Sequence, residues 1–347
     1  MYHKYVQNNR NANELEHAGI NFLKYLKQSD RSINSTYPCP YTLTMFALSK
    51  HYKDMNPEKS LSWIMKLKPN LLCRNLNFYN GNTSMSDLEK YYSAISRAFL
   101  KMENYDSAIK SSERALNELD DFSNHSEVWF YRRIALSYTA LGKYEDSIKN
   151  FEYVLKYKPE GYIYKENAEN YYHLGDFENA LNNLIEAVLI RESLNRYAKY
   201  DLMIKVLDKL GLVEKIDLHR DLLDAAKNGD NSKSKEIIKQ LTPYWESLKY
   251  KDQIKLTGFV SSVYGNGHSG KISLLEESDL DIERIVQSLG IETKDLELDK
   301  FYYSIRDFKG KGRLNRFDSV TFYLKKGFNK KFNREEPNAT NIELINL

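Results

Sequence analysis

The pentapeptide Tyr105-Asp106-Ser107-Ala108-Ile109 decides the fold, because its pattern returns as Tyr144-Glu145-Asp146-Ser147-Ile148 and as Phe177-Glu178-Asn179-Ala180-Leu181. In each copy an aromatic residue closes a turn, short polar residues open a helix, and a small residue follows at an inward-facing position. Aligned on their small residues, the copies lie 39 and 33 residues apart. This period predicts stacked helical hairpins, since one hairpin cannot bury its apolar face alone.

The alignment extends to both helices of each hairpin. Small residues recur twelve positions upstream, aromatic residues nine positions upstream, and compact apolar residues seven positions downstream: Ser96, Ala135 and Ala168, then Phe99, Tyr138 and Tyr171, then Ala115, Val154 and Ala187. Small side chains let two helices approach closely, and large aromatic side chains fill the space toward the next hairpin. We therefore expect Ala108, Ser147 and Ala180 to be buried where paired helices cross. The longer first interval carries an insert, Asp120–Glu127.

This pattern resembles the tetratricopeptide repeat (TPR), whose period is about 34 residues. The resemblance implies a scaffold that holds a protein partner on the concave surface formed by the first helix of each pair. Six residues fall at the spacing of that surface and are the candidate partner-binding residues: Tyr92, Arg97, Tyr131, Arg132, Asn167 and Asn170. An ordinary polar helix face is an equally good interpretation of each of them.

Less regular helices are expected before the three repeats. Asn11–Ser29 is predicted to be an amphipathic helix, with Leu15, Ala18, Phe22, Tyr25 and Leu26 on one stripe. A break at Ser32–Pro40 precedes a degenerate hairpin, Tyr41–Tyr52 and Pro57–Leu67, whose second helix begins after the N-cap Asn56 and turns Ser60 inward. Leu71–Met85 is expected to be an irregular connection with a turn at Asn80-Gly81-Asn82.

After the repeats, a fourth pair without the consensus residues is expected over Tyr197–Leu210 and Val213–Lys227. Gly211 and Gly229 stand where each helix should stop. Lys233–Leu248 is predicted to be a last helix that caps the solenoid, because the final repeat would otherwise expose its apolar face.

Around Lys251 the hydrophobic period changes from that of a helix to that of a strand. Short strands are expected within Ile254–Tyr264, Gly267–Ser273, Lys300–Ile305, Ser319–Leu324 and Asn341–Ile345, which suggests a small barrel. The predicted fold class is therefore a multidomain α plus β protein, a TPR-type α-solenoid followed by a small five-stranded β-barrel. The expected divisions are residues 1–85 for an N-terminal helical region, 86–250 for the solenoid, and 251–347 for the barrel.

The segments Phe301-Tyr302-Tyr303, Leu314–Phe322 and Pro337–Ile342 resemble the third, fourth and closing strands of the cold-shock domain. The resemblance implies an OB-type barrel that binds single-stranded RNA or DNA through the aromatic residues of its third strand. Three departures remove stacking platforms, because Ser262, Ser269 and Lys271 stand at positions where the family carries outward aromatic residues. Each lost platform weakens binding by roughly 1–3 kcal/mol. An insertion, Leu275–Asp299, is expected to hold the short helix Asp281–Leu289.

The chain's net charge of +3 conceals a polarised C-terminal module. Residues 300–334 carry eleven basic residues against two acidic ones, a net charge of +9, whereas residues 273–299 carry nine acidic residues against two basic ones, a net charge of −7. Basic residues interleaved with aromatic ones are typical of phosphate contacts beside stacking faces. The candidate nucleic-acid-binding residues are Lys271, His268, Phe301, Tyr303, Arg306, Phe308, Lys309, Lys311, Arg313 and Lys330. The alternative is a solvated basic rim around core aromatics, with Phe317 and Phe322 the residues most expected in the core.

Signals for catalysis are weak. Gly265–Lys271 has the spacing of a phosphate-binding P-loop, but Ile272 stands where that loop needs a hydroxyl for magnesium, so we interpret it as a glycine-rich β-turn. The seven histidines are dispersed, and Cys39 and Cys73 suffice for neither a disulfide framework nor a zinc cluster. We expect no enzymatic activity, no metal and no cofactor.

The first ten residues are polar, and no apolar run approaches the ~20 residues that span a bilayer. We expect a cytoplasmic protein that does not bind membranes. The favoured function is a non-enzymatic adaptor whose repeats bind a protein partner and whose barrel binds RNA or single-stranded DNA. The alternative is a pure protein-interaction scaffold whose barrel no longer binds nucleic acid.

Overall fold

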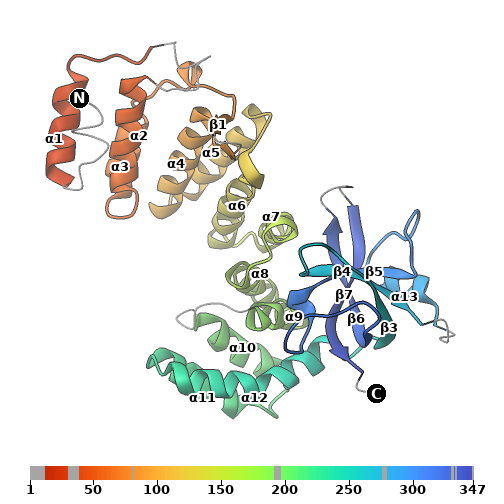
Figure 1. The fold of residues 1–347 in the computed structure, drawn as a ribbon. Coiled ribbons are helices and arrows are strands. Elements are labelled where there is room, and N and C mark those ends of the chain that lie inside the picture. The colour runs from red at the N-terminus through yellow and green to blue at the C-terminus, as the bar shows by residue number, and fades with distance from the viewer. Residues whose placement is uncertain are drawn as a thin grey trace. The chain divides into compact units, whose positions relative to one another are not determined.

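A computed structural model of the chain describes residues 12–29, 39–79, 82–190, 197–275, 280–329, 332 and 334–345 (Figure 1). The chain divides into two compact units, Met1–Leu241 and Thr242–Leu347. The first unit is helical, and the second contains the barrel. The sequence predicted the domain boundary after Tyr250, later in the chain than the observed boundary after Leu241. The reason is that α12 (Asn231–Lys249), the last helix of the array, continues across the observed boundary.

Through most of the first unit, helices that are consecutive in the chain pack against one another. Three pairs correspond to the sequence repeats: α4 (Asp87–Lys101) with α5 (Tyr105–Glu118), α6 (Val128–Ala140) with α7 (Tyr144–Tyr157), and α8 (Gly161–Leu174) with α9 (Phe177–Leu189). They are preceded by α1 (Ala12–Leu23), α2 (Pro40–Tyr52) and α3 (Pro57–Ile64), and followed by α10 (Ala198–Lys209), α11 (Ile216–Lys227) and α12 (Asn231–Lys249). The predicted pairs are confirmed.

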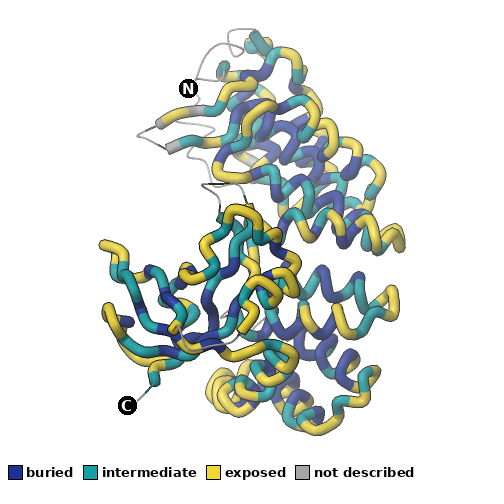
Figure 2. Tube along the Cα trace, turned by 90° about the vertical axis from the view of Figure 1, so that its right-hand side faces the viewer, coloured by how far each residue is buried: buried dark blue, intermediate teal, exposed yellow. Residues whose placement is uncertain are grey.

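The small residues of the repeats lie where the paired helices cross. Ala108, Ser147 and Ala180 are fully buried, as are the small residues aligned with them upstream and downstream. The hydroxyl of Ser147 donates to the carbonyl oxygen of Ala135 at 2.9 Å, so this polar side chain is satisfied inside the helix contact. Figure 2 shows the resulting row of buried residues along the inner faces of the helices. The register inferred from the sequence is therefore confirmed.

Several helix ends also follow the sequence signals. The side chain of Asn56 accepts a hydrogen bond from the backbone N–H of Lys59 at 2.9 Å, which is the predicted N-cap of α3. Gly211 and Gly229 adopt positive φ angles of 70° and 72° just beyond α10 and α11. An L-residue with a Cβ rarely adopts this conformation, so glycine is favoured at both stops.

The N-terminal part corrects two predictions. Helix α1 ends at Leu23, so Tyr25 lies beyond the helix and is 88% exposed instead of belonging to its apolar stripe. The expected irregular connection contains an antiparallel hairpin, β1 (Asn77–Tyr79) with β2 (Asn82–Ser84). The predicted break over Ser32–Pro38 and the turn residues Asn80 and Gly81 lie outside the described residues.

Five strands of the second unit close into a barrel in the order β3-β4-β5-β7-β6. Their bounds are β3 (Leu256–Val263), β4 (Ser269–Leu274), β5 (Lys300–Ser304), β6 (Ser319–Asn329) and β7 (Arg334–Leu344). Neighbouring strands are antiparallel except β5 and β7, which pair in parallel at Tyr302 and Asn338. The insertion between β4 and β5 carries α13 (Ile282–Ser288), and Asp281 caps this predicted helix by accepting from the N–H of Arg284 at 3.0 Å.

A close approach of β3 to β4 shapes one wall of the barrel. The pairing shifts by one residue between Val260 and Ser262, which marks a β-bulge in β3. A Cβ at Gly270 would lie only 2.0 Å from the carbonyl oxygen of Ser262, so only glycine permits this contact. The bulge turns Ser262 to the outside of the barrel, opposite Lys271.

Candidate binding sites

The third barrel strand presents a different aromatic residue to the outside from those predicted. Phe301 and Tyr303 are 0% and 2% exposed and pack in the barrel core with Phe322. Tyr302, between them, is 39% exposed. Successive side chains of a strand point to opposite faces, so the three consecutive aromatics could not all face outward. The prediction that Phe301 and Tyr303 stack on bases is wrong, because the register of β5 places them inside.

Outward side chains cross three strands as a row. Ser262 of β3 pairs with Lys271 of β4, and Lys271 pairs with Tyr302 of β5. Tyr264, just after β3, is 41% exposed, and its ring centroid lies 6.3 Å from that of Tyr302. The side-chain ammonium of Lys271 lies 3.7 Å from a carboxylate oxygen of Glu297 in the acidic insertion. The row therefore combines two exposed aromatic rings with one lysine.

Five of the nine described basic residues in the run that suggested nucleic acid are engaged in ion pairs within the second unit. Lys325 pairs with Asp307 at 2.5 Å, Lys326 with Glu335 at 2.7 Å, and Arg334 with Glu336 at 2.7 Å. Lys309 lies 2.6 Å from a carboxylate oxygen of Glu246 and 3.1 Å from one of Glu343. The charge of Lys309 is thus balanced by two carboxylates of the same unit, which makes it less available to a phosphate.

Four basic side chains of the loop between β5 and β6 make no ion pair with the described residues. They are the exposed residues Arg306, Lys311, Arg313 and Arg316. Arg313 lies against the turn between β3 and β4, since a Cβ at Gly267 would come within 2.7 Å of its guanidinium. His268, in the same turn, is exposed, and its carbonyl oxygen accepts from the N–H of Ile305 at the start of that loop. The loop and the turn are therefore neighbours at one end of the barrel.

The remaining predicted residues have mixed outcomes. Phe308 is 9% exposed and packs in the barrel core, so its prediction as a stacking residue is wrong. Phe317, expected in the core, is 67% exposed, and the guanidinium of Arg316 lies 4.8 Å from the centre of its ring. The backbone of Phe317 has a positive φ of 73°, which places the residue in a turn instead of in β6. Lys330 lies outside the described residues.

The glycine-rich segment is a β-turn, as predicted. The N–H of Gly267 donates to the carbonyl oxygen of Tyr264 at 2.8 Å, and Lys271 lies within strand β4. A P-loop leads from a strand into a helix whose N-terminus receives the phosphate. Here the segment joins two strands, so that geometry does not arise.

In the repeat unit, three of the six predicted partner-binding residues lie inside the helix contacts. Tyr92 is 2% exposed and donates to Glu118 at 2.8 Å, while Asn167 and Asn170 are 2% and 0% exposed. Asn170 accepts from Thr139 at 2.8 Å, which links α8 to α6. These residues hold neighbouring helices together, and their burial contradicts a direct role on a binding surface.

The other three residues are half-buried. Arg132 on α6 forms a bidentate ion pair with Glu166 on α8. Its Nε donates to one carboxylate oxygen at 2.8 Å, and its Nη2 donates to the other. The ring of Tyr131 lies 4.0 Å from that of Tyr153, centroid to centroid. Arg97 also remains partly accessible. These three stay candidates for contact with a partner.

An arginine that the sequence did not single out lies beside them. Arg133 is 7% exposed, its Nη2 donates to the hydroxyl of Ser93 at 3.1 Å, and its Nη1 has no partner among the described residues. Burial, together with the nearby charges of Arg97 and Arg132, lowers the pKa of Arg133 to about 9. The sequence did not indicate that Arg133 is buried, since helix periodicity alone does not distinguish a buried arginine from a solvated one.

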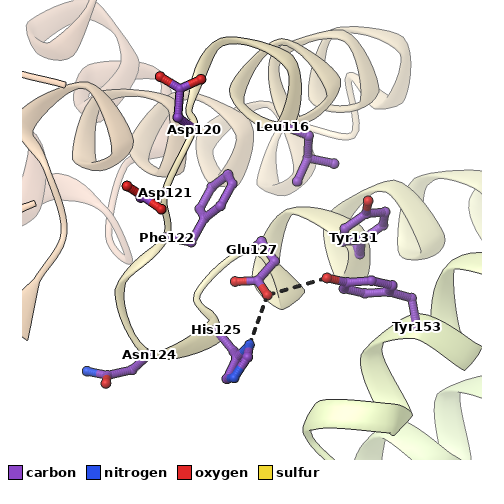
Figure 3. Close-up of a pocket in the computed structure, with 9 residues that line it drawn as sticks. All are labelled: Leu116, Asp120, Asp121, Phe122, Asn124, His125, Glu127, Tyr131 and Tyr153. Carbon is purple, nitrogen blue, oxygen red and sulfur yellow. Dashed lines mark hydrogen bonds and ion pairs between the residues drawn. The ribbon is translucent and has the colours of Figure 1, made fainter. Parts of the chain in front are cut away.

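A cavity of about 450 Å³ lies beside the insert between the first and second repeats (Figure 3). It is lined by residues from α5, the insert, α6 and α7: Leu116, Asp120, Asp121, Phe122, Asn124, His125, Glu127, Tyr131 and Tyr153. The hydroxyl of Tyr153 donates to Glu127 Oε1 at 3.3 Å, and His125 Nδ1 lies 3.2 Å from the same oxygen. Burial and the charge of Glu127 both raise the pKa of Tyr153, so this phenol stays protonated as a donor.

Within the described ranges, the structure holds no group of three or more His, Cys, Asp or Glu side chains arranged to bind a metal ion. Among the same residues, no helix is both long enough and apolar enough to cross a membrane.

Comparison with known proteins identifies one repeat. The tetratricopeptide repeat family model matches residues 89–118, which cover most of α4 and α5. No curated protein matches the sequence. Two solved structures of MamA AMB-1 are similar to the chain at 14% sequence identity, with TM-scores of 0.39 and 0.42. The similarity covers 57% and 55% of this chain, and 96% and 91% of those chains.

Proposed function

We propose that the protein is a cytoplasmic, non-enzymatic adaptor whose repeats bind a protein partner and whose barrel binds single-stranded nucleic acid. For the repeats, the support is the tetratricopeptide match at residues 89–118, extended by the buried small residues of the next two pairs. Repeats of this kind stack into extended surfaces that suit protein recognition. Two free thiols, Cys39 and Cys73, agree with a reducing compartment.

For the barrel, one observation carries the proposal. Tyr264 and Tyr302 expose their rings on the outer face, while unpaired basic side chains extend from the adjoining loop. Exposed rings offer stacking platforms to bases, and basic loops attract the phosphate backbone. The strand order β3-β4-β5-β7-β6, with its parallel β5–β7 pair, also supports the resemblance to the OB-type barrel of cold-shock domains.

The second candidate is a protein-interaction scaffold without nucleic-acid binding. The burial of Phe301 and Tyr303 favours it, as do the serines at 262 and 269 in place of aromatic platforms. Ion pairing of Lys309, Lys325, Lys326 and Arg334 also lowers the charge available to phosphates. The two candidates differ in one measurable property of the full chain, its affinity for single strands.

The test is a fluorescence-anisotropy titration of the full chain with RNA and DNA oligomers at several salt concentrations. If Z phosphates are neutralised, log K should fall with log salt at a slope near −0.7Z. Replacing Arg306, Lys311, Arg313 and Arg316 together by glutamine should weaken binding to every oligomer and flatten the slope. Absence of binding to both polymers at low salt would leave the scaffold as the function.

A further inference from the structure

The cavity beside the insert is built by residues that fix the insert in place. The hydroxyl of Ser123 donates to the carbonyl oxygen of Thr83 in the β1–β2 hairpin at 3.1 Å. The hydroxyl of Ser126 donates to the buried carboxylate of Glu89 on α4. Phe122 meets Phe130 of α6 edge to face, with 6.0 Å between the ring centroids. These contacts hold the insert against three neighbouring elements, so the cavity has defined walls.

The lining of the cavity carries negative charge. Asp120, Asp121 and Glu127 contribute carboxylates, and the nine described lining residues include neither lysine nor arginine. Glu127 has a side chain that is only 13% exposed, and its Oε2 is buried without a hydrogen-bond partner among the described residues. A buried acceptor that lacks a partner destabilises the protein. Glu127 therefore places a largely buried carboxylate in the wall of the cavity.

Aromatic rings supply the other wall. Tyr131 and Tyr153 lie with their centroids 4.0 Å apart, and Tyr153 lies 5.1 Å from Tyr157. His125, also a lining residue, stacks at 4.7 Å on Tyr157, which does not line the cavity itself. The face of an aromatic ring attracts cations, and the attraction strengthens when the cation is removed from water. Carboxylates and ring faces around one cavity therefore favour a cationic group with a flat shape.

We propose that this cavity binds an arginine side chain presented by a basic segment of the protein partner. The inference rests on the proposed adaptor function and adds to it the chemistry of one contact. A guanidinium is planar, stacks on aromatic rings and carries a permanent positive charge, which the carboxylate of Glu127 in the cavity wall attracts. Asp120 and Asp121, both exposed at the rim, favour further basic residues beside that arginine.

The first experiment measures how tightly the full chain binds a fluorescein-labelled peptide. The peptide consists of glycine and serine with two arginines. The matched probe is the same peptide with citrulline in place of arginine, which keeps the shape and removes the charge. We expect the arginine peptide to bind at least about tenfold more tightly than the citrulline peptide, since a charged donor meets a buried carboxylate. Equal affinity for the two peptides would overturn the proposal.

Variants then assign the binding to the cavity. Glu127→Gln should weaken binding of the arginine peptide about tenfold, because it removes the negative charge of a largely buried carboxylate from the cavity wall. The double variant Asp120→Asn, Asp121→Asn changes exposed positions where folding is not at risk. It should weaken binding of the arginine peptide about threefold and reduce the salt dependence of that binding. Glu113→Gln, an exposed charge change on α5 outside the lining, is the control and should bind as the parent does. Parent-like affinity of Glu127→Gln and of the double variant would contradict the proposal.

The last comparison separates this inference from the adaptor proposal. The parent, Glu127→Gln and Glu113→Gln are immobilised as full chains and exposed to the same cell extract. A protein retained equally by all three would leave the adaptor function standing and overturn the arginine site. If none retains a protein while the arginine peptide still discriminates Glu127→Gln from the parent, the site stands and the adaptor proposal fails.

Discussion

Lys309 lies 2.6 Å from a carboxylate oxygen of Glu246, which joins the loop after β5 to the C-terminal part of α12. A second carboxylate, Glu343 of β7, lies 3.1 Å from the same ammonium and also pairs with Lys255 at 2.6 Å. Burial alone would lower the pKa of Lys309, but the hydrogen bonds to Glu246 and Glu343 outweigh it and raise that pKa. The lysine therefore stays charged and links the loop after β5 to the C-terminal part of α12 and to β7.

Lys309→Gln should lower the free energy of unfolding by about 1 kcal/mol, because two partly exposed ion pairs are lost together. Nucleic-acid affinity should change less than about twofold, which corresponds to less than about 0.4 kcal/mol. Lys311→Gln is the matched control, since Lys311 is exposed two positions away and makes no ion pair with the described residues. It should leave urea unfolding unchanged and weaken binding to single strands. The reverse pattern would show that Lys309, not Lys311, contacts phosphate.

Tyr302→Ala should weaken binding to single strands by about 1–3 kcal/mol and leave the salt slope unchanged, because it removes a stacking ring and no charge. Phe301→Ala, one residue earlier, should instead destabilise the fold by about 3–5 kcal/mol, since it empties a fully buried position. Anisotropy titrations and urea unfolding of both variants distinguish the two effects. If Tyr302→Ala binds like the parent, the outer face of β5 is not a stacking platform.

Ala180→Trp should destabilise the repeats by about 1–3 kcal/mol or more, because the residue is fully buried at the crossing of α8 and α9. Asn182→Trp places the same ring at an exposed position of the same helix and should unfold like the parent. Thermal unfolding followed by circular dichroism makes the comparison. A parent-like melting curve for Ala180→Trp would contradict the helix register.

Glu89 makes stability depend on pH. Burial raises the pKa of this fully buried carboxyl despite the hydrogen bond from Ser126, so the folded state binds a proton more tightly than the unfolded state does. Stability should therefore increase as the pH falls from neutrality toward the ordinary value of 4.5. Glu89→Gln removes the charge and should raise the free energy of unfolding at pH 7.5 by on the order of 1 kcal/mol.

The advantage of Glu89→Gln should shrink as the pH is lowered toward 5, because the parent then carries the proton itself. Asp87, whose pKa burial also raises, should preserve part of the pH dependence in the variant. Urea unfolding of both proteins across this range measures the difference. A difference in unfolding free energy that stays constant with pH would show that Glu89 keeps the same charge state throughout.

The repeat register could be predicted because its signal is local and redundant. Ala108, Ser147 and Ala180 each stand in the same short pattern, and each helix crossing excludes larger side chains. The outward face of β5 could not be predicted in this way. Three aromatic residues in succession fit either register equally well, and only pairing with β4 and β7 decides that Tyr302 faces out.

The cavity beside the insert was missed for a different reason. Its acidic residues lie in the insert, whereas Tyr131 and Tyr153 come from two separate helices. The sequence showed Asp120–Glu127 only as an interruption of the period. The insert itself carried a useful signal for a binding site, since its three carboxylates lie close in sequence to the aromatic residues Phe122 and His125.

The insert also has a consequence for engineering. It lengthens one interval to 39 residues, yet Ala108 and Ser147 at the helix crossings on either side are as fully buried as Ala180. Scaffold and loop are therefore separable in this array. Other loops could be grafted between Leu119 and Val128, provided that they retain the serines that anchor the segment to Thr83 and Glu89. Ligand preference could then be exchanged at this junction while the helices that carry it are left unaltered.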